Sequence, residues 1–244
     1  MEEYINIDGL KVCTRIKGEG SPFLILHGWG SSIKSWITLQ DFLSEKFKVY
    51  VLDMPGFGNT PPPSEAWDLD NYLDFIIKYC KHYNIDQFYL LGHSFGGRIS
   101  IKMAISHPEK IKKLILMDAA GIRRTDKVMG LLAGLGYWKG VPGYKTARKV
   151  FYKLKGCTDY CDAKGTMKGI FNNVVKEDLR NRLQEVKLST LLIWGKYDKS
   201  TPLEDGKIMD KEIEDTKLII VDSGHSPHLV MPEQIRDILF KELC

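Results

Sequence analysis

The pentapeptide Gly92–Gly96, Gly-His-Ser-Phe-Gly, is the feature that most constrains the fold of this chain. It follows the short apolar run Phe88–Leu91 and precedes an apolar, helix-like segment, Ile99–Ile105. A strand that turns this sharply into a helix leaves no space for side chains beside the turn, so glycines are needed there. Such a turn would lift Ser94 out of a sheet. A serine hydroxyl is a weak nucleophile near neutral pH, so a catalytic role for Ser94 depends on a nearby base.

Short apolar runs alternate with segments of helical spacing along most of the chain. Phe23–Leu26 is continuously apolar, as expected of a strand buried on both faces of a sheet, whereas Leu69–Tyr83 has apolar residues at helical spacing. We expect eight strands, near residues 4–8, 10–16, 23–26, 47–53, 88–91, 113–118, 190–195 and 218–221. This alternation predicts an α/β fold with a parallel, doubly wound sheet. Asp8-Gly9 predicts an antiparallel hairpin at its start.

The alternation stops at residues 121–187, where the apolar patches are helix-like and separated by glycines. We therefore predict an α/β core at 1–120 and 188–244, and a helical cap at 121–187 inserted between strands six and seven. Such an insertion should lie over the carboxyl ends of the strands, where ligands bind in these sheets. Between residues 121 and 190 there are fifteen Lys or Arg against six Asp or Glu, in a chain of formal charge +4. This region predicts a solvated basic face or a surface for an acidic substrate or carrier protein.

Several classes of protein are disfavoured by the sequence. The basic region lacks the dense cationic runs and interleaved aromatics of a nucleic-acid face. No apolar run approaches the roughly 18 residues of a membrane span, and the acidic start indicates no secretory signal. Five scattered cysteines favour reduced thiols in a cytoplasmic protein. No set of residues has convincing metal-ligand spacing and no complete phosphate-binding loop is present, so we expect neither a metal nor a cofactor.

Two polar residues downstream of Ser94 follow expected strands. Asp198 comes after the strand at 190–195, and His225 after the strand at 218–221, so both should lie at the same sheet edge as Ser94. His225 would act as the base for Ser94, and Asp198 would orient the imidazole and stabilise its protonated form. Asp118 also ends a strand and is the alternative acid; we favour Asp198. His228, three residues beyond His225, is the main competitor as the base.

The order Ser, Asp, His along the chain and five motifs resemble those of α/β-hydrolases of the capped carboxylesterase and meta-cleavage-hydrolase type. The motifs occur in the family's order along nearly the whole chain, at His27–Gly30, Asp53–Gly58, Gly92–Gly97, Ile193–Asp198 and Gly224–His228. The resemblance implies an α/β-hydrolase fold, with a mostly parallel eight-stranded sheet and a cap. It also implies an oxyanion hole made by the backbone N–H groups of Trp29 and Phe95.

Further residues are expected near the substrate: His27, Gly28, Trp138 and His228. Our leading hypothesis is hydrolysis of small carboxylic esters through an acyl-Ser94 intermediate. The resemblance also allows carbon–carbon hydrolysis of a vinylogous diketone, with Arg123 or Arg124 holding a carboxylate. Two further alternatives are an esterase for an acyl group on an acidic carrier protein and, less favoured, a ligand receptor without turnover.

Overall fold

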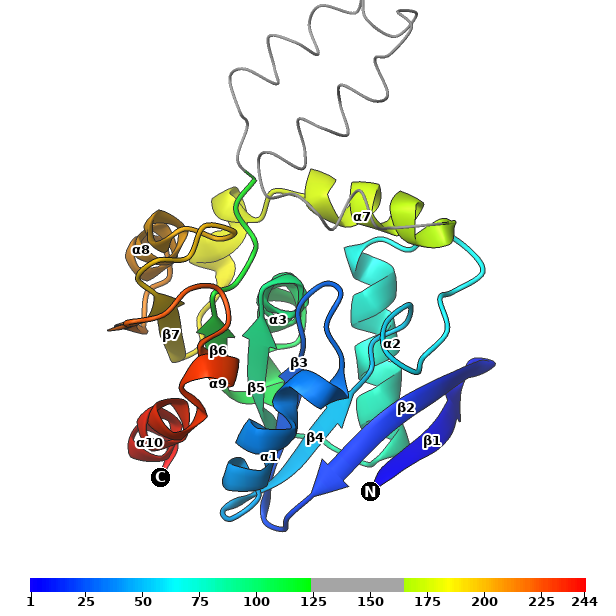
Figure 1. The fold of residues 1–244 in the computed structure, drawn as a ribbon. Coiled ribbons are helices and arrows are strands. Elements are labelled where there is room, and N and C mark those ends of the chain that lie inside the picture. Colours follow the sequence, from blue (N-terminus) through cyan, green and yellow to red (C-terminus); the bar gives the residue numbers. More distant parts are fainter. Residues whose placement is uncertain (124–164) are drawn as a thin grey trace, which may run out of the picture.

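A single eight-stranded sheet forms the centre of the protein, whose computed structural model describes residues 1–123 and 165–244 (Figure 1). The strand order is β1-β2-β4-β3-β5-β6-β7-β8. The first two strand pairs, β1 with β2 and β2 with β4, are antiparallel, and all other neighbours are parallel. The predicted mostly parallel sheet is therefore confirmed. The strands are β1 (Glu2–Ile7), β2 (Leu10–Lys17), β3 (Ser21–Leu26), β4 (Phe47–Leu52), β5 (Phe88–His93), β6 (Ile111–Met117), β7 (Thr190–Gly195) and β8 (Thr216–Val221).

The hairpin between β1 and β2 turns at Asp8 and Gly9, as predicted. Both residues have positive φ, 51° and 85° respectively, which is the requirement of a two-residue hairpin turn that follows the twist of the strands. Ile7 and Leu10 pair across the turn.

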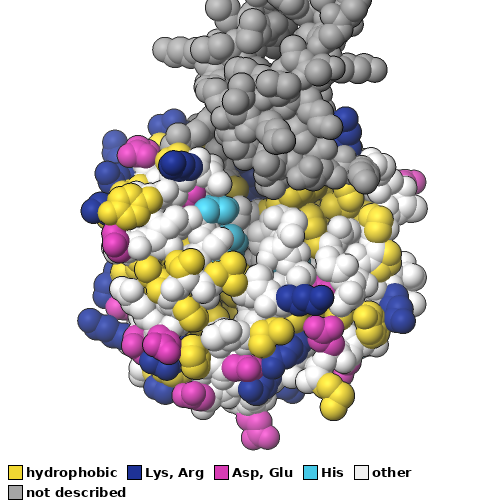
Figure 2. Space-filling model, in the orientation of Figure 1, with side chains coloured by type: hydrophobic (Ala, Val, Ile, Leu, Met, Phe, Trp, Pro, Cys, Tyr) yellow, Lys and Arg dark blue, Asp and Glu magenta, His cyan; other side chains and the backbone are white. Residues whose placement is uncertain are grey.

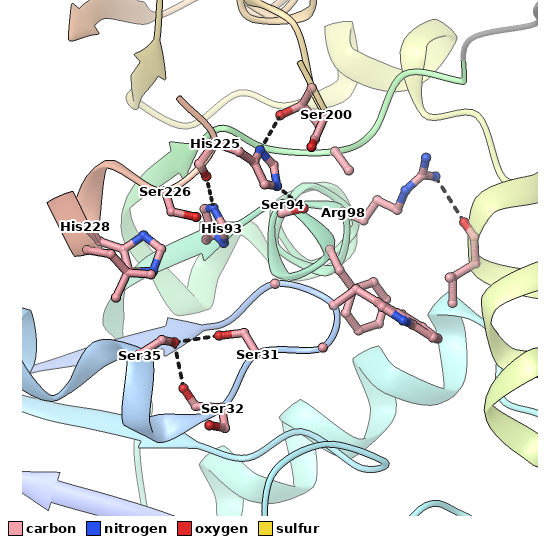
Figure 3. Close-up of a pocket in the computed structure, with 18 of the residues that line it drawn as sticks. Ser31, Ser32, Ser35, His93, Ser94, Arg98, Ser200, His225, Ser226 and His228 are labelled. Carbon is pink, nitrogen blue, oxygen red and sulfur yellow. Dashed lines mark hydrogen bonds between the residues drawn. The ribbon is translucent and has the colours of Figure 1, made fainter. Parts of the chain in front are cut away.

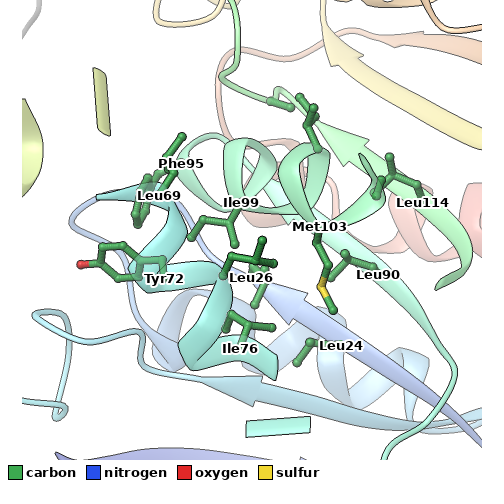
Figure 4. Packing of buried hydrophobic residues seen from close by; sticks show 14 of the residues in the cluster. Leu24, Leu26, Leu69, Tyr72, Ile76, Leu90, Phe95, Ile99, Met103 and Leu114 are labelled. Atoms are coloured by element: carbon green, nitrogen blue, oxygen red, sulfur yellow. The ribbon is translucent and has the colours of Figure 1, made fainter. Parts of the chain in front are cut away.

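The parallel strands in the middle of the sheet have long apolar stretches because helices cover both faces of the sheet. In β3, Leu24 and Leu26 belong to one hydrophobic cluster, whereas the intervening Phe23 and Ile25 belong to the other. Figure 4 shows Leu24 and Leu26 packed among residues of two helices. The first face is covered by α2 (Leu69–His82), α3 (Phe95–Ser106) and α8 (Leu203–Glu212), and the second by α1 (Ile37–Leu43) and α10 (Pro232–Leu243).

The start of α2 is set by a reciprocal pair of hydrogen bonds. Asn71 N donates to the Asp68 side chain at 3.0 Å, and Asp68 N donates to Asn71 Oδ1 at 3.0 Å. A cap of this kind stabilises a helix by about 1 kcal/mol. From this anchored start, Tyr72 reaches the first residue of α3 and packs edge-on against Phe95, with ring centroids 5.1 Å apart. The helix α2 therefore supports the beginning of α3.

Two expected helices differ from the structure in type or extent. The helix expected at residues 35–45 begins as a 3-10 turn, Ile33–Trp36, before α1. The helix-like patch at 178–186 forms a 3-10 helix, Arg180–Glu185. Its apolar residues Leu179, Leu183 and Val186 are fully buried, so the spacing reflects burial on one side rather than the type of helix.

The described part of the predicted cap consists of α7 (Thr166–Lys176) and the 3-10 helix that follows it. In Figure 1, α7 lies across the sheet edge at which the parallel strands end, above α2 and α3. It is held there by contacts such as the hydrogen bond from Asn173 Nδ2 to Ala66 O at 3.0 Å. Residues 124–164 of the predicted cap lie outside the described residues, and Trp138 is among them, so the cap boundaries at 121 and 187 stay a prediction.

Candidate active site

The turn between β5 and α3 holds Ser94 in a strained conformation, with φ 50° and ψ −114°. Glycines on both sides make this possible. A Cβ on Gly92 would lie 2.3 Å from Ser100 Oγ, and one on Gly96 would lie 2.1 Å from Leu26 O. Because neither position has space for a side chain, the predicted requirement for both glycines is confirmed. The turn projects the Ser94 hydroxyl from the carboxyl edge of the sheet into a cavity.

His225 reaches this hydroxyl from the loop after β8 (Figure 3). Its Nε2 lies 3.0 Å from Ser94 Oγ. On the other side of the ring, Nδ1 lies 2.7 Å from Asp198 Oδ2. A carboxylate can only accept, so Nδ1 carries the proton and Nε2 has a lone pair directed at the serine hydroxyl. The structure thus brings together the three residues predicted to act on one another. Neither Asp118 nor His228 occupies these positions.

Asp198 is poised to remain ionised. Its side chain is fully buried, and its Oδ1 accepts hydrogen bonds from Ser200 N at 2.7 Å and Thr201 N at 3.1 Å. Burial acts to raise the pKa of this carboxyl, but the hydrogen bond and charge of His225, with the bonds from Thr201, outweigh it and hold the pKa below its ordinary value. A carboxylate in this state can stabilise an imidazolium on His225.

Asp118 directly follows β6, lies beside Asp198 and is in a different protonation state. It is completely buried with φ 42°, and its Oδ1 accepts from Gly195 N at 2.8 Å. Its Oδ2 has no hydrogen-bond partner among the described residues. Burial, with the charge of the adjacent Asp198, raises the pKa of Asp118 to about 8. At neutral pH Asp118 is therefore mostly neutral, which separates it from the ionised Asp198.

Two backbone N–H groups are available beside Ser94. In the described part of the chain, neither Trp29 N nor Phe95 N has a hydrogen-bond partner, whereas Gly96 N donates to His27 O at 3.1 Å and Gly97 N donates to Ser94 O at 2.9 Å. Phe95 N belongs to the first turn of α3, whose dipole favours negative charge. These two donors are the ones that the family resemblance implied.

His27 holds the loop that carries Trp29 and does not line the cavity. The ring is completely buried; its Nδ1 donates to Gly28 O at 2.8 Å, and its Nε2 accepts from Met54 N at 3.0 Å. The expectation that His27 contacts substrate is therefore wrong, because both ring nitrogens bind backbone. Gly28 does line the cavity.

His93 and His228 line the cavity as neutral rings. His93 Nε2 donates to His225 O at 2.7 Å, and burial holds its pKa well below the ordinary value. His228 stacks on Trp36, with ring centroids 3.9 Å apart, and burial lowers its pKa to about 3. His228 thus remains uncharged over the whole range of ordinary pH, and it lies beside the reacting groups, as expected, rather than replacing His225.

The cavity has a volume of about 910 Å³ and two unlike walls. Histidine side chains reach the surface in a hollow on the face shown in Figure 2. One wall carries the hydroxyl groups of Ser31, Ser32, Ser35 and Ser226; the other carries Trp29, Phe95, Phe171, Val174 and Val175. Within the second wall, Trp29 packs edge-on against Phe171 of α7 at 5.0 Å. The cavity can therefore accept an apolar group on one side of Ser94 and a polar group on the other.

Sequence reasoning missed Arg98, which also lines the cavity. Its position four residues after Ser94 is one helical turn along α3, and this spacing could have placed it on the same side of the helix. Neither of the two arginines proposed from the sequence, Arg123 and Arg124, is shown to line the cavity. Arg123 is exposed and does not line the cavity, and Arg124 lies outside the described residues.

The chain belongs to the α/β-hydrolase fold family, whose model matches residues 21–149. It is a hydrolase of this family, and its relatives include an esterase and a dienoate hydrolase. A pimeloyl-[acyl-carrier protein] methyl ester esterase of Aeromonas hydrophila subsp. hydrophila is 25% identical, over 91% of this chain and 95% of its own length. A 2-hydroxy-6-oxo-2,4-heptadienoate hydrolase of Pseudomonas putida is 26% identical, over 91% and 87%.

The fold is shared with solved structures at lower identity. A meta-cleavage product hydrolase from Pseudomonas fluorescens superposes with a TM-score of 0.77 at 21% identity, over 99% of this chain and 98% of that one. In the described ranges, no helix combines the length and apolar character needed to cross a membrane. Those same ranges contain no cluster of three or more His, Cys, Asp or Glu arranged to hold a metal ion.

Proposed function

We propose that this hydrolase cleaves small carboxylic esters through an acyl-Ser94 intermediate. The observation that carries the proposal is the continuous hydrogen-bonded path from Ser94 Oγ through both nitrogens of His225 to Asp198. Esterases among the relatives support the choice of an ester bond.

The first half of the reaction forms the acyl-enzyme. Ser94 Oγ attacks the ester carbonyl carbon while His225 Nε2 takes its proton, and the carbonyl electron pair moves onto oxygen. The resulting oxyanion accepts hydrogen bonds from Trp29 N and Phe95 N, each worth about 3 kcal/mol of transition-state stabilisation. When the carbonyl re-forms, the ester C–O bond breaks and His225 returns its proton to the leaving alkoxide. Asp198 stabilises the imidazolium throughout.

The second half releases the acid. Water attacks the acyl carbon with His225 Nε2 as the base, the same two N–H groups hold the second oxyanion, and the proton passes back to Ser94 Oγ as the bond to the acyl group breaks. Because the two halves use the same groups, loss of any member of the triad should impair both.

A fluorophosphonate probe together with a series of short 4-nitrophenyl esters tests the proposal. We expect the probe to label the native protein at Ser94, and Ser94→Ala to abolish both labelling and ester turnover. Folded protein that neither reacts with the probe nor turns over any ester would contradict the proposal and favour a receptor without turnover.

Carbon–carbon hydrolysis of a vinylogous diketone is the second candidate, supported by the 2-hydroxy-6-oxo-2,4-heptadienoate hydrolase relative and by the arginine in the cavity wall. Turnover of a meta-cleavage dienoate should be compared with that of the short esters under identical conditions. A kcat/KM for the dienoate well above that of every ester would replace the ester proposal with this one.

The basic region at 121–190 carries a third, alternative proposal, that it forms a surface for an acidic substrate or carrier protein. Activity on a carrier-bound acyl ester should then fall steeply with added salt, because salt screens exposed charges. Activity on the carrier-bound ester that does not change with salt would argue against such a partner. The predicted cytoplasmic location would be tested by fractionation of the native cells.

A further inference from the structure

Arg98 is a buried cation in the wall of the cavity. Only 6% of its surface is exposed, yet it lines the same cavity as Ser94. It lies four residues beyond Ser94 on α3, which places it about 6 Å further along the helix axis. In Figure 3 its side chain extends from α3 toward α7, away from His225.

One nitrogen of the Arg98 guanidinium donates all of its hydrogens to protein acceptors, and the other two nitrogens do not. Nη1 donates to Val174 O at 3.1 Å and to Glu177 O at 2.5 Å, which accounts for both of its hydrogens. In the described part of the chain, Nε and Nη2 donate no hydrogen bond, and neither is shut off from solvent. Nε and Nη2 form the edge of a guanidinium that binds a carboxylate through two parallel hydrogen bonds. This edge has no partner among the described residues.

Arg98 also forms no ion pair within the described ranges, although the charges of Asp178 and Glu177 act on it from a greater distance. Within residues 1–123 and 165–244 no carboxylate pairs with it; the nearby Glu177 carboxylate instead binds Lys102 Nζ at 2.8 Å. Burial lowers the pKa of Arg98 only to about 10, so the group stays protonated at neutral pH. An unpaired buried charge is costly, and a ligand that supplies the opposite charge removes that penalty.

The rest of the cavity wall points to the same sign of ligand. Its described lining contains two further cations, Lys34 and Lys199, and no Asp or Glu. The apolar side chains of Phe171 and Val174 lie in the wall on the α7 side, where Arg98 is anchored to the Val174 carbonyl. A substrate could therefore place a short apolar spacer against these residues and a negative group at the guanidinium edge.

We propose that Arg98 binds a carboxylate of the substrate through its Nε and Nη2 edge, so that the preferred substrates are half-esters of short dicarboxylic acids. The proposal rests on the ester hydrolysis proposed above and names its substrate class. Arg98 would act in binding and orientation, and the helical distance from Ser94 would select the length of the spacer.

A matched pair of substrates tests the proposal without any mutation. Monomethyl glutarate carries a carboxylate, and the methyl ester of glutaric acid monoamide replaces it with a neutral group of the same shape. We expect the native enzyme to prefer the carboxylate in kcat/KM by about 10- to 100-fold, as for other hydrogen bonds to a charged group. The preference should appear chiefly in KM. Equal kcat/KM values for the two esters would overturn the proposal.

Variants then assign the preference to Arg98. Arg98→Gln should bring the ratio of the two kcat/KM values close to one, and Arg98→Lys, which keeps the charge but loses the planar edge, should give an intermediate ratio. Lys102→Met is the control, because Lys102 lies one turn further on the same helix, binds the same Glu177 and does not line the cavity. It should keep the native ratio.

The outcomes separate this proposal from the proposed function. If Arg98→Gln lowered both kcat/KM values equally and left their ratio at the native value, Arg98 would only anchor α7, and the proposal would be wrong. If Ser94 reacted with fluorophosphonate and neutral esters were cleaved as well as half-esters, the serine hydrolase would stand and only the substrate class would fail. If Arg98→Gln did not fold, the ratio for Arg98→Lys would decide; an unchanged native ratio in that variant would count against the planar edge.

Discussion

Replacing Asp118 by Asn should make the protein more resistant to alkaline pH. In the folded state burial and the charge of Asp198 raise the pKa of Asp118 to about 8, whereas an unfolded Asp titrates near 3.9. The folded state therefore binds the proton more tightly, and between about pH 4 and pH 8 it holds more protons than the unfolded state. By linkage, the native protein loses stability as pH rises through this window and loses no more above it.

The structure sets the scale of the effect. A difference of about four pKa units corresponds to roughly 5 kcal/mol at 1.36 kcal/mol per unit, which is an upper bound. Relaxation and water entry reduce such penalties in proteins, so we expect about 2 kcal/mol. In the variant, the amide oxygen would still accept from Gly195 N, and the side chain would stay neutral at every pH.

Urea unfolding of the native protein and Asp118→Asn at pH 5, 7 and 9 measures this difference. With an m value of about 3 kcal/mol per M, the midpoint of the variant should gain roughly 0.7 M on the native protein between pH 5 and pH 9. Asp222→Asn, at an exposed carboxyl after β8, is the control and should give no comparable gain. If the urea midpoints of the native protein and Asp118→Asn changed equally with pH, or if the midpoint of the variant fell relative to the native one, Asp118 would not be neutral in the folded state.

The site makes three further predictions. Ser94→Ala and His225→Ala should each remove nearly all esterase activity, and the double variant should be no less active than either, because the residues act as a unit; additive losses in kcat would contradict this. Asp198→Asn should lower kcat about 10⁴-fold by favouring the wrong imidazole tautomer, whereas Asp118→Asn should lower it far less, and the reverse order in steady-state kinetics would move the acid to Asp118. Gly96→Ala should destabilise the fold by about 3 kcal/mol or prevent it, since its Cβ would lie 2.1 Å from Leu26 O, whereas Gly224→Ala, with nothing within 4 Å of its Cβ, should melt near the native temperature.

The sheet and the turn at Ser94 could be predicted because local chemistry leaves few alternatives. A continuous apolar run such as Phe23–Leu26 is shielded from water only in a strand whose two faces are both covered. Glycines are required at 92 and 96 because a Cβ there would collide with atoms of the same turn or of the neighbouring strand. Asp198 and His225 follow from the same logic, since parallel strands end at one edge. These inferences require only the order of strands and helices along the chain, and no knowledge of how individual side chains pack.

Prediction from the sequence fails where two segments distant in the sequence meet. The motif around His27 suggests a contact with substrate, but the ring is enclosed because the loop after β4 supplies Met54 N to its second nitrogen. The importance of Arg98 depends on α7, some 70 residues later, where backbone carbonyls take two of its hydrogens and leave a free edge toward the cavity. No local pattern around either residue contains this information.

Most of the titratable side chains buried around Ser94 are neutral at ordinary pH. Burial keeps His93 and His228 neutral by lowering their pKa values and keeps Asp118 neutral by raising its pKa, each in the direction that removes charge. Asp198 and Arg98, by contrast, remain charged in the buried surroundings of the site. Asp198 has a partner within the protein, the imidazolium that forms during attack. Arg98 forms no ion pair with a carboxylate of the described ranges, and in the proposal above the substrate supplies that carboxylate.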